Sequence, residues 1–350
     1  MVALTRSLTA QAPGDLRWLR VEDASAAVAC RGAALALASR LGFPAPRADE
    51  LALAVTEAAS NLPKHARQGS MLVRIMRDAV TSDGSTRDGG GPGIELVTID
   101  AGPGFRDTGA ALRDGHSTSG TLGIGLGAIS RLADFCDLYS MPGHGTALVA
   151  RFWPAPRKRA TRYAGLVRPI AGEAECGDVF GVAETEADLI GVLCDGLGHG
   201  PLAATAAAQG VAAVLEEPPG EPAALVERAH RRMSHTRGGA IGVVHVTDDG
   251  QVVRFAGLGN IAAVILAEGA RKGMISVPGI AGHQARVIRQ FEYTAPPGAA
   301  IILHSDGISG RWEPGELPGL NARDPLVVGA MVLAEAGTRR DDAGVLVLKP

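Results

Sequence analysis

The sequence predicts an α+β protein with two domains, and three observations support this prediction. The chain has 350 residues, which exceeds the usual size of one domain, and its hydrophobic content of 46% is enough for two cores. Helix-like and strand-like apolar patterns occur along most of its length. Residues 154–162 lack such patterns and combine prolines with a basic run, as linkers do. We therefore expect domains at residues 1–153 and 163–350, with this linker between them.

The first domain is expected to combine helices with a sheet. Residues 1–14 are expected to form a loose leader, and residues 16–21 alternate weakly, as in an edge strand. Helices are predicted over 24–41 and from Ala48 to about Pro63, because proline bends or ends a helix. The other predicted elements are a helix over 128–135 and strands over 71–76, 94–99, 136–140 and 146–152.

The second domain is expected to be richer in strands. Short apolar runs predict strands near 163–170, 177–184, 188–194, 240–247, 251–257, 261–266, 285–292, 299–305 and 343–349. Longer segments predict helices at about 200–216, 222–236 and 324–336. Many strands with a few long helices between them predict packed sheets with helices outside, which is a sandwich of the α+β class.

Acidic residues stand at the ends of apolar runs in the second domain. Asp178 lies in Cys-Gly-Asp, Asp195 opens Asp-Gly-Leu-Gly-His-Gly, and Asp306 follows the run 301–305. Asp341 and its neighbour Asp342 precede the last predicted strand. One Asp-Gly pair alone equally predicts a turn after a strand. Rigidly held carboxylates are ligands of hard divalent cations, so these strand ends could converge on one metal cluster.

Polar residues and a glycine-rich loop in the first domain suggest a phosphate-binding site. Glu57 and Asn61 lie four residues apart on one side of a predicted helix, and Asp100 ends a predicted strand. The glycine-rich segment 117–127 leads directly into a helix, where backbone N–H groups and the helix dipole favour phosphate oxygens. The amide oxygen of Asn61 suits Mg²⁺, and Asp100 can accept a hydrogen bond from an adenine amino group. Each glycine-rich stretch alone also fits a tight turn.

The run TEAASNLPKHA, followed by DAGPGF and GTLGIGLG, resembles the N box and the two G boxes of the GHKL (Bergerat) ATP-binding fold. The resemblance covers about residues 16–153 and is to the anti-sigma and stressosome switch-kinase branch. It implies an α/β sandwich that binds ATP and Mg²⁺, with Asn61 on Mg²⁺, Asp100 on adenine and Glu57 as general base for a partner's hydroxyl. It also implies a phosphate pocket shaped by Gly102, Gly104, Gly123, Gly125 and Gly127, while Thr118 contacts phosphate or caps a turn.

The order GD…DGLGHG…SDGI…DDAGVLVL resembles the SpoIIE-type branch of the PPM metal-dependent Ser/Thr protein phosphatases, over about residues 163–350. It implies an α-β-β-α sandwich that holds two Mn²⁺ or Mg²⁺ ions, with Asp195 bridging both and acting with Asp306 in catalysis. The implied ligands are Asp178, Asp195, the carbonyl of Gly196, Asp306 and Asp341, with Asp342 as the alternative to Asp341. The sequence leaves the roles of three further residues open. His199 could protonate the leaving oxygen or be a structural turn residue, and Asn260 could act near the site or cap a turn. Arg168 could clamp phosphate.

Composition argues against several other classes. The net charge of −3 and the aromatic content of 4% give no support for binding to nucleic acid or to a membrane surface. The four cysteines lack CxxC or zinc spacing. The chain shows no secretory signal and no apolar run of about 20 residues. We expect a cytoplasmic protein with reduced thiols that binds neither nucleic acid nor membrane.

Together the two resemblances imply a bifunctional partner-switching regulator. The N-terminal domain would phosphorylate Ser or Thr of a STAS-domain partner with ATP, and the C-terminal domain would remove phosphate in a metal-dependent reaction. The alternative is that the N-terminal domain only binds its partner in an ATP-dependent complex and that the phosphatase alone is active.

Overall fold

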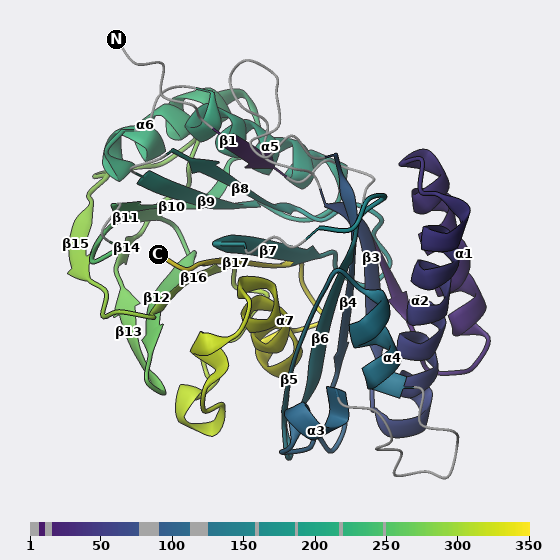
Figure 1. Cartoon of the computed structure of the whole chain (residues 1–350). Helices are drawn as coiled ribbons and strands as arrows, with labels where there is room; N and C mark the ends of the chain where they lie inside the picture. The colour runs from purple at the N-terminus through teal and green to yellow at the C-terminus, as the bar shows by residue number, and fades with distance from the viewer. Residues whose placement is uncertain are drawn as a thin grey trace. The chain divides into compact units, whose positions relative to one another are not determined.

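The structure is a computed structural model that describes residues 7–10, 16–76, 91–112, 125–157, 161–185, 188–216, 220–247 and 250–350. The chain divides into two compact units (Figure 1). The N-terminal unit contains the described residues between 16 and 157. The C-terminal unit contains those from 161 to 350 together with strand β1 (Ser7–Ala10). No helix in the described residues is long and apolar enough to cross a membrane.

The N-terminal unit is a five-stranded antiparallel sheet with helices on one face, in the strand order β2-β3-β4-β6-β5 (Figure 1). Its strands are β2 (Leu16–Arg20), β3 (Ser70–Met76), β4 (Gly93–Asp100), β5 (Phe135–Met141) and β6 (Gly145–Phe152). Its helices are α1 (Ala26–Arg40), α2 (Ala45–His65), α3 (Thr108–Leu112) and α4 (Gly125–Leu132).

Helix α2 anchors the core of this unit. Its apolar residues recur at helical spacing, so one face packs on the sheet while the opposite face carries charge. Leu51, Val55 and Leu62 are buried on that face, in one cluster with Leu96 of β4 and Leu148 of β6. This packing fixes the position of the polar residues that α2 carries near its C-terminal end.

The C-terminal unit is a sandwich of two sheets. The first has the order β1-β8-β9-β10-β11-β14, with β15 also pairing to β11, and the second has the order β13-β12-β16-β17-β7. The first contains β8 (Asp178–Glu184), β9 (Asp188–Gly196), β10 (Gly239–Thr247), β11 (Val252–Leu258), β14 (Ser276–Val277) and β15 (Phe291–Thr294). The second contains β7 (Tyr163–Arg168), β12 (Ala262–Ala267), β13 (Ala270–Met274), β16 (Ala300–His304) and β17 (Ala343–Leu348).

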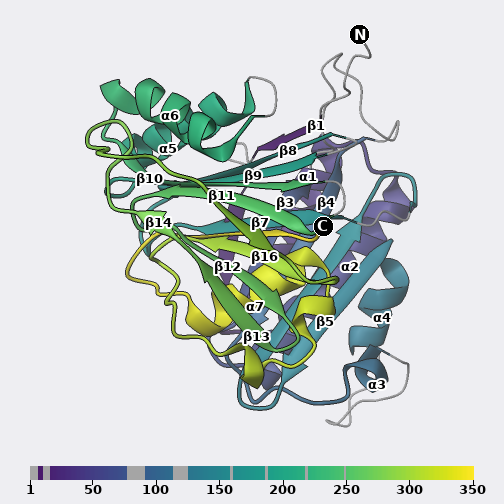
Figure 2. The same cartoon turned by 90° about the vertical axis from the view of Figure 1, so that its left-hand side faces the viewer.

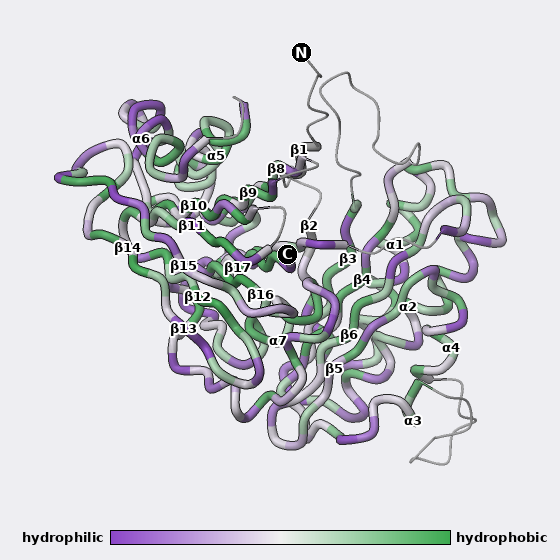
Figure 3. Tube along the Cα trace, turned by 60° about the vertical axis from the view of Figure 1, so that its left-hand side comes forward, coloured by the Kyte–Doolittle hydropathy of each residue, from purple (hydrophilic) through white to green (hydrophobic). Residues whose placement is uncertain are grey.

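Helices cover both outer faces of this sandwich. Helices α5 (Pro201–Leu215) and α6 (Pro222–Arg232) pack on the first sheet, and α7 (Pro325–Ala336) packs on the second (Figure 2). Between the sheets, Leu346 of β17 lies against Gly191 of β9. Figure 3 shows apolar residues along strands such as β10 and β17 and polar residues on α6. The predicted α-β-β-α sandwich is therefore confirmed.

The structure corrects three expectations from the sequence. Residues 7–10, expected in a loose leader, form β1, whose backbone pairs with β8. Helix α2 begins at Ala45, three residues before the expected start, and ends at His65, shortly after Pro63. The strand expected over 285–292 is reduced to β15, because β14 already occupies the next part of the β11 edge and pairing with β15 begins only at Phe291.

Candidate functional site

The acidic residues predicted as metal ligands lie at the ends of neighbouring strands in the C-terminal unit. Asp178 begins β8 and Asp195 is the last but one residue of β9, and the antiparallel register places the two directly opposite each other. Asp306 follows β16 by two residues, and Asp341 precedes the adjacent strand β17 by two residues. Both sheets of the sandwich therefore contribute strand-end carboxylates.

Hydrogen bonds join the two sheets at this point. Ser305 donates from Oγ to Oδ2 of Asp178 at 2.6 Å and accepts from the backbone N–H of Gly344 at 2.9 Å. Asn260 donates from Nδ2 to Oδ2 of Asp306, also at 2.6 Å. These contacts orient the two carboxylates, and they assign Asn260 a place that the sequence left open. The only sequence signal for Ser305 was its position directly before Asp306.

The carboxylates at these strand ends interact electrostatically with one another. Burial raises the pKa of Asp195 to about 7, and the negative charges of Asp306 and Asp341 add to this effect. Burial and the charge of Asp195 raise the pKa of Asp178 well above its usual value. Oδ1 of Asp178 is buried and accepts no hydrogen bond within the described part of the chain. A cluster of oxygen donors with such an oxygen fits hard divalent cations such as Mg²⁺ or Mn²⁺.

Metal binding is expected to depend on pH through Asp195. Below about pH 7 this carboxyl is protonated in the metal-free protein, so a cation must displace the proton. We expect the Mn²⁺ affinity to rise by up to about tenfold per pH unit up to about pH 7 and then to level off. Titration calorimetry at several pH values below and above 7 measures the Mn²⁺ affinity, and an affinity independent of pH would contradict the prediction.

The stability of the metal-free protein is expected to change in the opposite direction. A carboxyl with a raised folded-state pKa stabilises the fold most when it is protonated. The contribution of Asp195 is therefore complete below a pH of about 4 and is lost as the pH rises through about 7.

Asp341 and Asp342 have different environments. Asp342 is buried, and its two carboxylate oxygens accept backbone N–H groups of Ile170 at 2.8 Å and of Gly177 at 2.9 Å. Asp341 is exposed, and its Oδ1 accepts the backbone N–H of Asp342 at 2.9 Å. The carboxylate of Asp342 therefore fixes both ends of the loop between β7 and β8, which favours Asp341 as the candidate metal ligand.

Asparagine variants of this pair test the choice. Asp341→Asn is expected to weaken Mn²⁺ binding by at least about 10- to 100-fold, while leaving the fold intact. Asp342→Asn is expected to lower the free energy of unfolding by about 1–3 kcal/mol, because an amide N–H₂ faces a backbone donor. Both changes remove one charge, so each variant controls for the other. Calorimetry measures the Mn²⁺ affinity, and urea unfolding measures the free energy of unfolding. The choice would be contradicted if Asp342→Asn weakened Mn²⁺ binding and Asp341→Asn lowered the free energy of unfolding.

Glycine is required where the loops around the site touch. A Cβ on Gly196 would lie 2.0 Å from the carbonyl oxygen of Ala203, and a Cβ on Gly307 would lie 1.8 Å from that of Asp342. At these two glycines, the chain at the end of β9 and after β16 packs tightly against the backbone of Ala203 and of Asp342. The backbone carbonyl of Gly196, predicted as a ligand, thus lies in a tightly packed segment directly after Asp195.

Two of the residues with open roles make contacts that position loops. Nδ1 of His199 lies 2.9 Å from Oε1 of Glu173, and both side chains are partly exposed at the loop that follows Asp195. Arg168 donates from Nη2 to the carbonyl oxygen of Thr338 at 2.9 Å. Glu173 was not expected near the site, and no motif in the sequence indicated it.

The N-terminal unit brings its own predicted site residues together. Glu57 and Asn61 lie one turn apart on α2, and both are half-buried. Gly125 is the first residue of α4, and a Cβ built on it would lie 3.9 Å from Nδ2 of Asn61. Gly127 is buried within α4. The polar end of α2 therefore lies beside the N-terminus of α4, where backbone N–H groups favour phosphate.

Asp100 ends β4 beside this site. Its Oδ1 accepts the backbone N–H of Gly102 at 2.7 Å, and burial raises its pKa to about 6. Gly104 has a φ of +63°, and a Cβ on it would lie 2.0 Å from the carbonyl oxygen of Met141, so only glycine fits. The predicted residues Thr118 and Gly123 lie outside the described residues.

Parts of the chain resemble known proteins of two kinds. Residues 20–152 match the family model of a histidine kinase-like ATPase domain. The chain is 32% identical over 126 residues to the serine/threonine-protein kinase RsbT of Bacillus subtilis, which covers 36% of this chain and 87% of the kinase. It is 22% identical over 139 residues to the phosphoserine phosphatase RsbX of the same bacterium, which covers 39% of this chain and 70% of the phosphatase.

Solved structures also resemble part of the chain. One, from work on the bacterial stressosome, is 27% identical, with a TM-score of 0.49, and the match covers 54% of this chain and 98% of that one. Another, of RsbX in complex with magnesium, is 18% identical, with a TM-score of 0.46, and the match covers 54% of this chain and 96% of that one.

Proposed function

We propose that this chain is a bifunctional partner-switching regulator of the cytoplasm. The chain belongs to the histidine kinase-like ATPase family, and it joins a GHKL-type domain to a PPM-type phosphatase domain. The N-terminal domain transfers phosphate from ATP to a Ser or Thr of a STAS-domain partner, and the C-terminal domain removes it. The observation that supports this most is the convergence of carboxylates from four strand ends in the C-terminal unit.

The C-terminal reaction is the hydrolysis of a phosphoserine or phosphothreonine ester. Two divalent cations held at this site would lower the pKa of a water molecule and neutralise charge on the phosphate. The residues of the chain position the candidate ligands: Asp195 lies opposite Asp178 near the end of β9, Ser305 donates a hydrogen bond to Asp178, and Asn260 donates one to Asp306. Because hydrogen bonds fix these side chains, little reorganisation is needed when the substrate binds.

In the N-terminal reaction, the Ser or Thr hydroxyl of the partner protein lies beside Glu57. This carboxylate lies one helical turn from Asn61, which offers an amide oxygen to Mg²⁺ on the ATP phosphates. Glu57 accepts the hydroxyl proton as the oxygen attacks the γ-phosphate, as a general base within hydrogen-bond reach does. Asp100 offers a carboxylate, oriented by the backbone N–H groups of Gly102 and Thr146, to an adenine amino group.

Incubation of the full chain with a STAS-domain protein tests both activities. With ATP and Mg²⁺ we expect phosphate on one Ser or Thr of that protein, and after removal of ATP we expect Mn²⁺-dependent loss of the same phosphate. Mass spectrometry of the STAS protein measures both. Absence of transfer together with absence of Mn²⁺-dependent release would overturn the proposal.

A further inference from the structure

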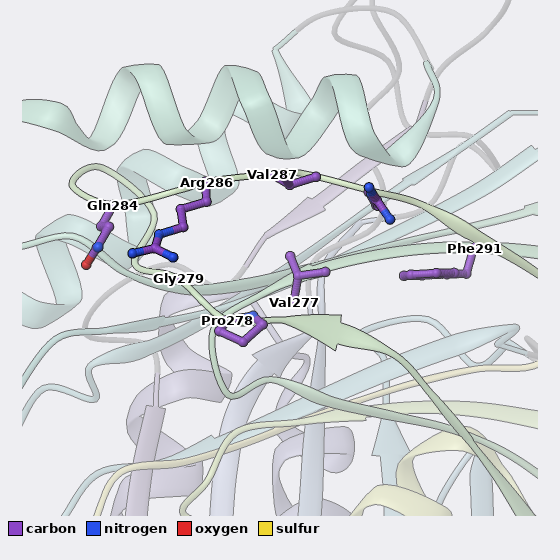
Figure 4. Close-up of a pocket in the computed structure, with 8 residues that line it drawn as sticks. Val277, Pro278, Gly279, Gln284, Arg286, Val287 and Phe291 are labelled. Atoms are coloured by element: carbon purple, nitrogen blue, oxygen red, sulfur yellow. The ribbon is translucent and has the colours of Figure 1, made fainter.

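The C-terminal unit contains a pocket of about 530 Å³ in which none of the acidic site residues takes part (Figure 4). Such a volume is typical of ligand sites. The pocket is formed by β14, the start of β15 and the segment between them. Its apolar lining includes Val277, Val287 and Phe291, and its polar lining includes Gln284, Arg286 and Arg289. Figure 4 shows Gln284 and Arg286 at one end of the pocket and Phe291 at the other.

The charge of this pocket is unbalanced. Arg286 and Arg289 are both exposed, and neither has an ion-pair or hydrogen-bond partner among the residues that the structure describes. Arg254, on the neighbouring strand β11, instead forms ion pairs with Glu221 and Glu292. Two unpaired guanidinium groups beside an apolar floor complement an acidic segment that also carries an apolar side chain.

Backbone hydrogen bonds connect the pocket directly to the phosphatase site. Val277 accepts the backbone N–H of Gly259 at 2.9 Å, and the next residue, Asn260, donates to Asp306. On the other side, Ala281 and Gly239 exchange two backbone hydrogen bonds, of 2.7 and 3.1 Å. Gly239 lies opposite Gly196 in the sheet register. The segment that forms the pocket is thus attached to residues beside two of the candidate metal ligands.

A third arginine, Arg237, lies between the candidate phosphatase site and the segment that forms the pocket. Arg237 is exposed and has no partner among the described residues, and its Nη1 would lie 3.1 Å from a Cβ built on Gly198. Gly198 belongs to the loop after Asp195, and Arg237 precedes the glycines that contact Ala281. Positive charge therefore extends from the loop of the phosphatase site toward the pocket.

We propose that this pocket binds an acidic segment of the phosphoprotein substrate while its phosphorylated residue occupies the phosphatase site. The proposal rests on the proposed phosphatase function. From Gly196 through Gly239 to Ala281 is two strand spacings, and the bridge between Ile280 and Gln284 adds a third, so the polar end of the pocket lies about 15 Å from Gly196. An extended peptide spans this in about four to five residues, so the acidic residues are expected from about the fourth position on either side of the phosphorylated one.

Peptide binding tests the inference without any need for catalysis. Two labelled phosphoserine peptides are compared, one with glutamates from the fourth position outward on both sides and one with glutamines there. Fluorescence anisotropy with the full chain is expected to show about three- to tenfold tighter binding of the acidic peptide at low salt, from two exposed ion pairs. The double variant Arg286→Glu with Arg289→Glu is expected to lose this preference. A double variant of exposed arginines in the N-terminal unit, Arg20→Glu with Arg31→Glu, has the same net charge and is expected to keep it.

Kinetics separate failure of the inference from failure of the proposed function. For hydrolysis with Mn²⁺, the pocket variant is expected to raise KM for the acidic peptide while leaving p-nitrophenyl phosphate hydrolysis unchanged. Equal binding of the two peptides by the unaltered chain, or an unchanged preference in the pocket variant, overturns the inference. If no substrate is hydrolysed although the acidic peptide binds through the pocket, the phosphatase function fails and the docking surface stands.

Discussion

Replacement of Asp195 by asparagine is expected to slow the hydrolysis of phosphoserine substrates by about a thousandfold or more. A metal centre supplies several kcal/mol of transition-state stabilisation, and Asp195 lies opposite Asp178 and interacts electrostatically with Asp306 and Asp341. An amide at this position keeps the shape of the side chain but removes the negative charge that would hold the divalent cations. Initial rates on a phosphoserine peptide and on p-nitrophenyl phosphate, over a range of Mn²⁺ concentrations, measure the effect.

The same substitution should stabilise the metal-free protein, which provides a control for folding. Above about pH 7 Asp195 is ionised beside Asp306 and Asp341, and this repulsion destabilises the fold. Asp195→Asn removes it, so the melting temperature without metal is expected to rise at pH 8 and to change little at pH 5. Retention of Mn²⁺-dependent hydrolysis in a folded Asp195→Asn variant would refute the assigned role.

The candidate site was predictable where acidic residues follow short apolar runs. Asp178 begins β8, while Asp195 and Asp306 lie at or just after the ends of β9 and β16, and all three strands could be located from the sequence. Strand ends that lie side by side bring such residues together. The choice between Asp341 and Asp342 was not predictable, because it depends on backbone N–H groups of a loop about 165 to 172 residues away in the sequence. Sequence spacing carries no information on such contacts.

Two other parts of the fold depended on which segments pair with the available sheet edges. The alternating pattern of residues 285–292 fits a strand, but β14 already occupies the adjacent edge of β11, so the segment forms the wall of a pocket instead. β1 (Ser7–Ala10) also depends on an available edge, that of β8, far along the chain. Local periodicity indicates which segments can be strands, whereas free sheet edges decide which of them are.

The other large effect is expected at Glu57, where Glu57→Gln should reduce phosphate transfer to a STAS-domain partner by about 10²- to 10⁴-fold, the usual contribution of a general base. Gln keeps the size of the side chain but does not accept the hydroxyl proton. Glu57 is half-buried on α2, one turn from Asn61, so nucleotide affinity is expected to change by less than about twofold. Transfer of labelled phosphate and titration with a fluorescent ATP analogue measure the two quantities.

This variant also separates a kinase from a domain that only binds its partner. Asn61→Ala is the matched control, because the side-chain amide of Asn61 lies beside the start of α4. Its loss is expected to weaken Mg²⁺·ATP binding itself and so to remove both phosphate transfer and any ATP-dependent complex. If Glu57→Gln abolishes transfer and regulation together, the carboxylate acts in catalysis. If regulation of the partner survives Glu57→Gln but is lost in Asn61→Ala, the N-terminal domain works by ATP-dependent sequestration, and phosphate removal is the only chemistry of the chain.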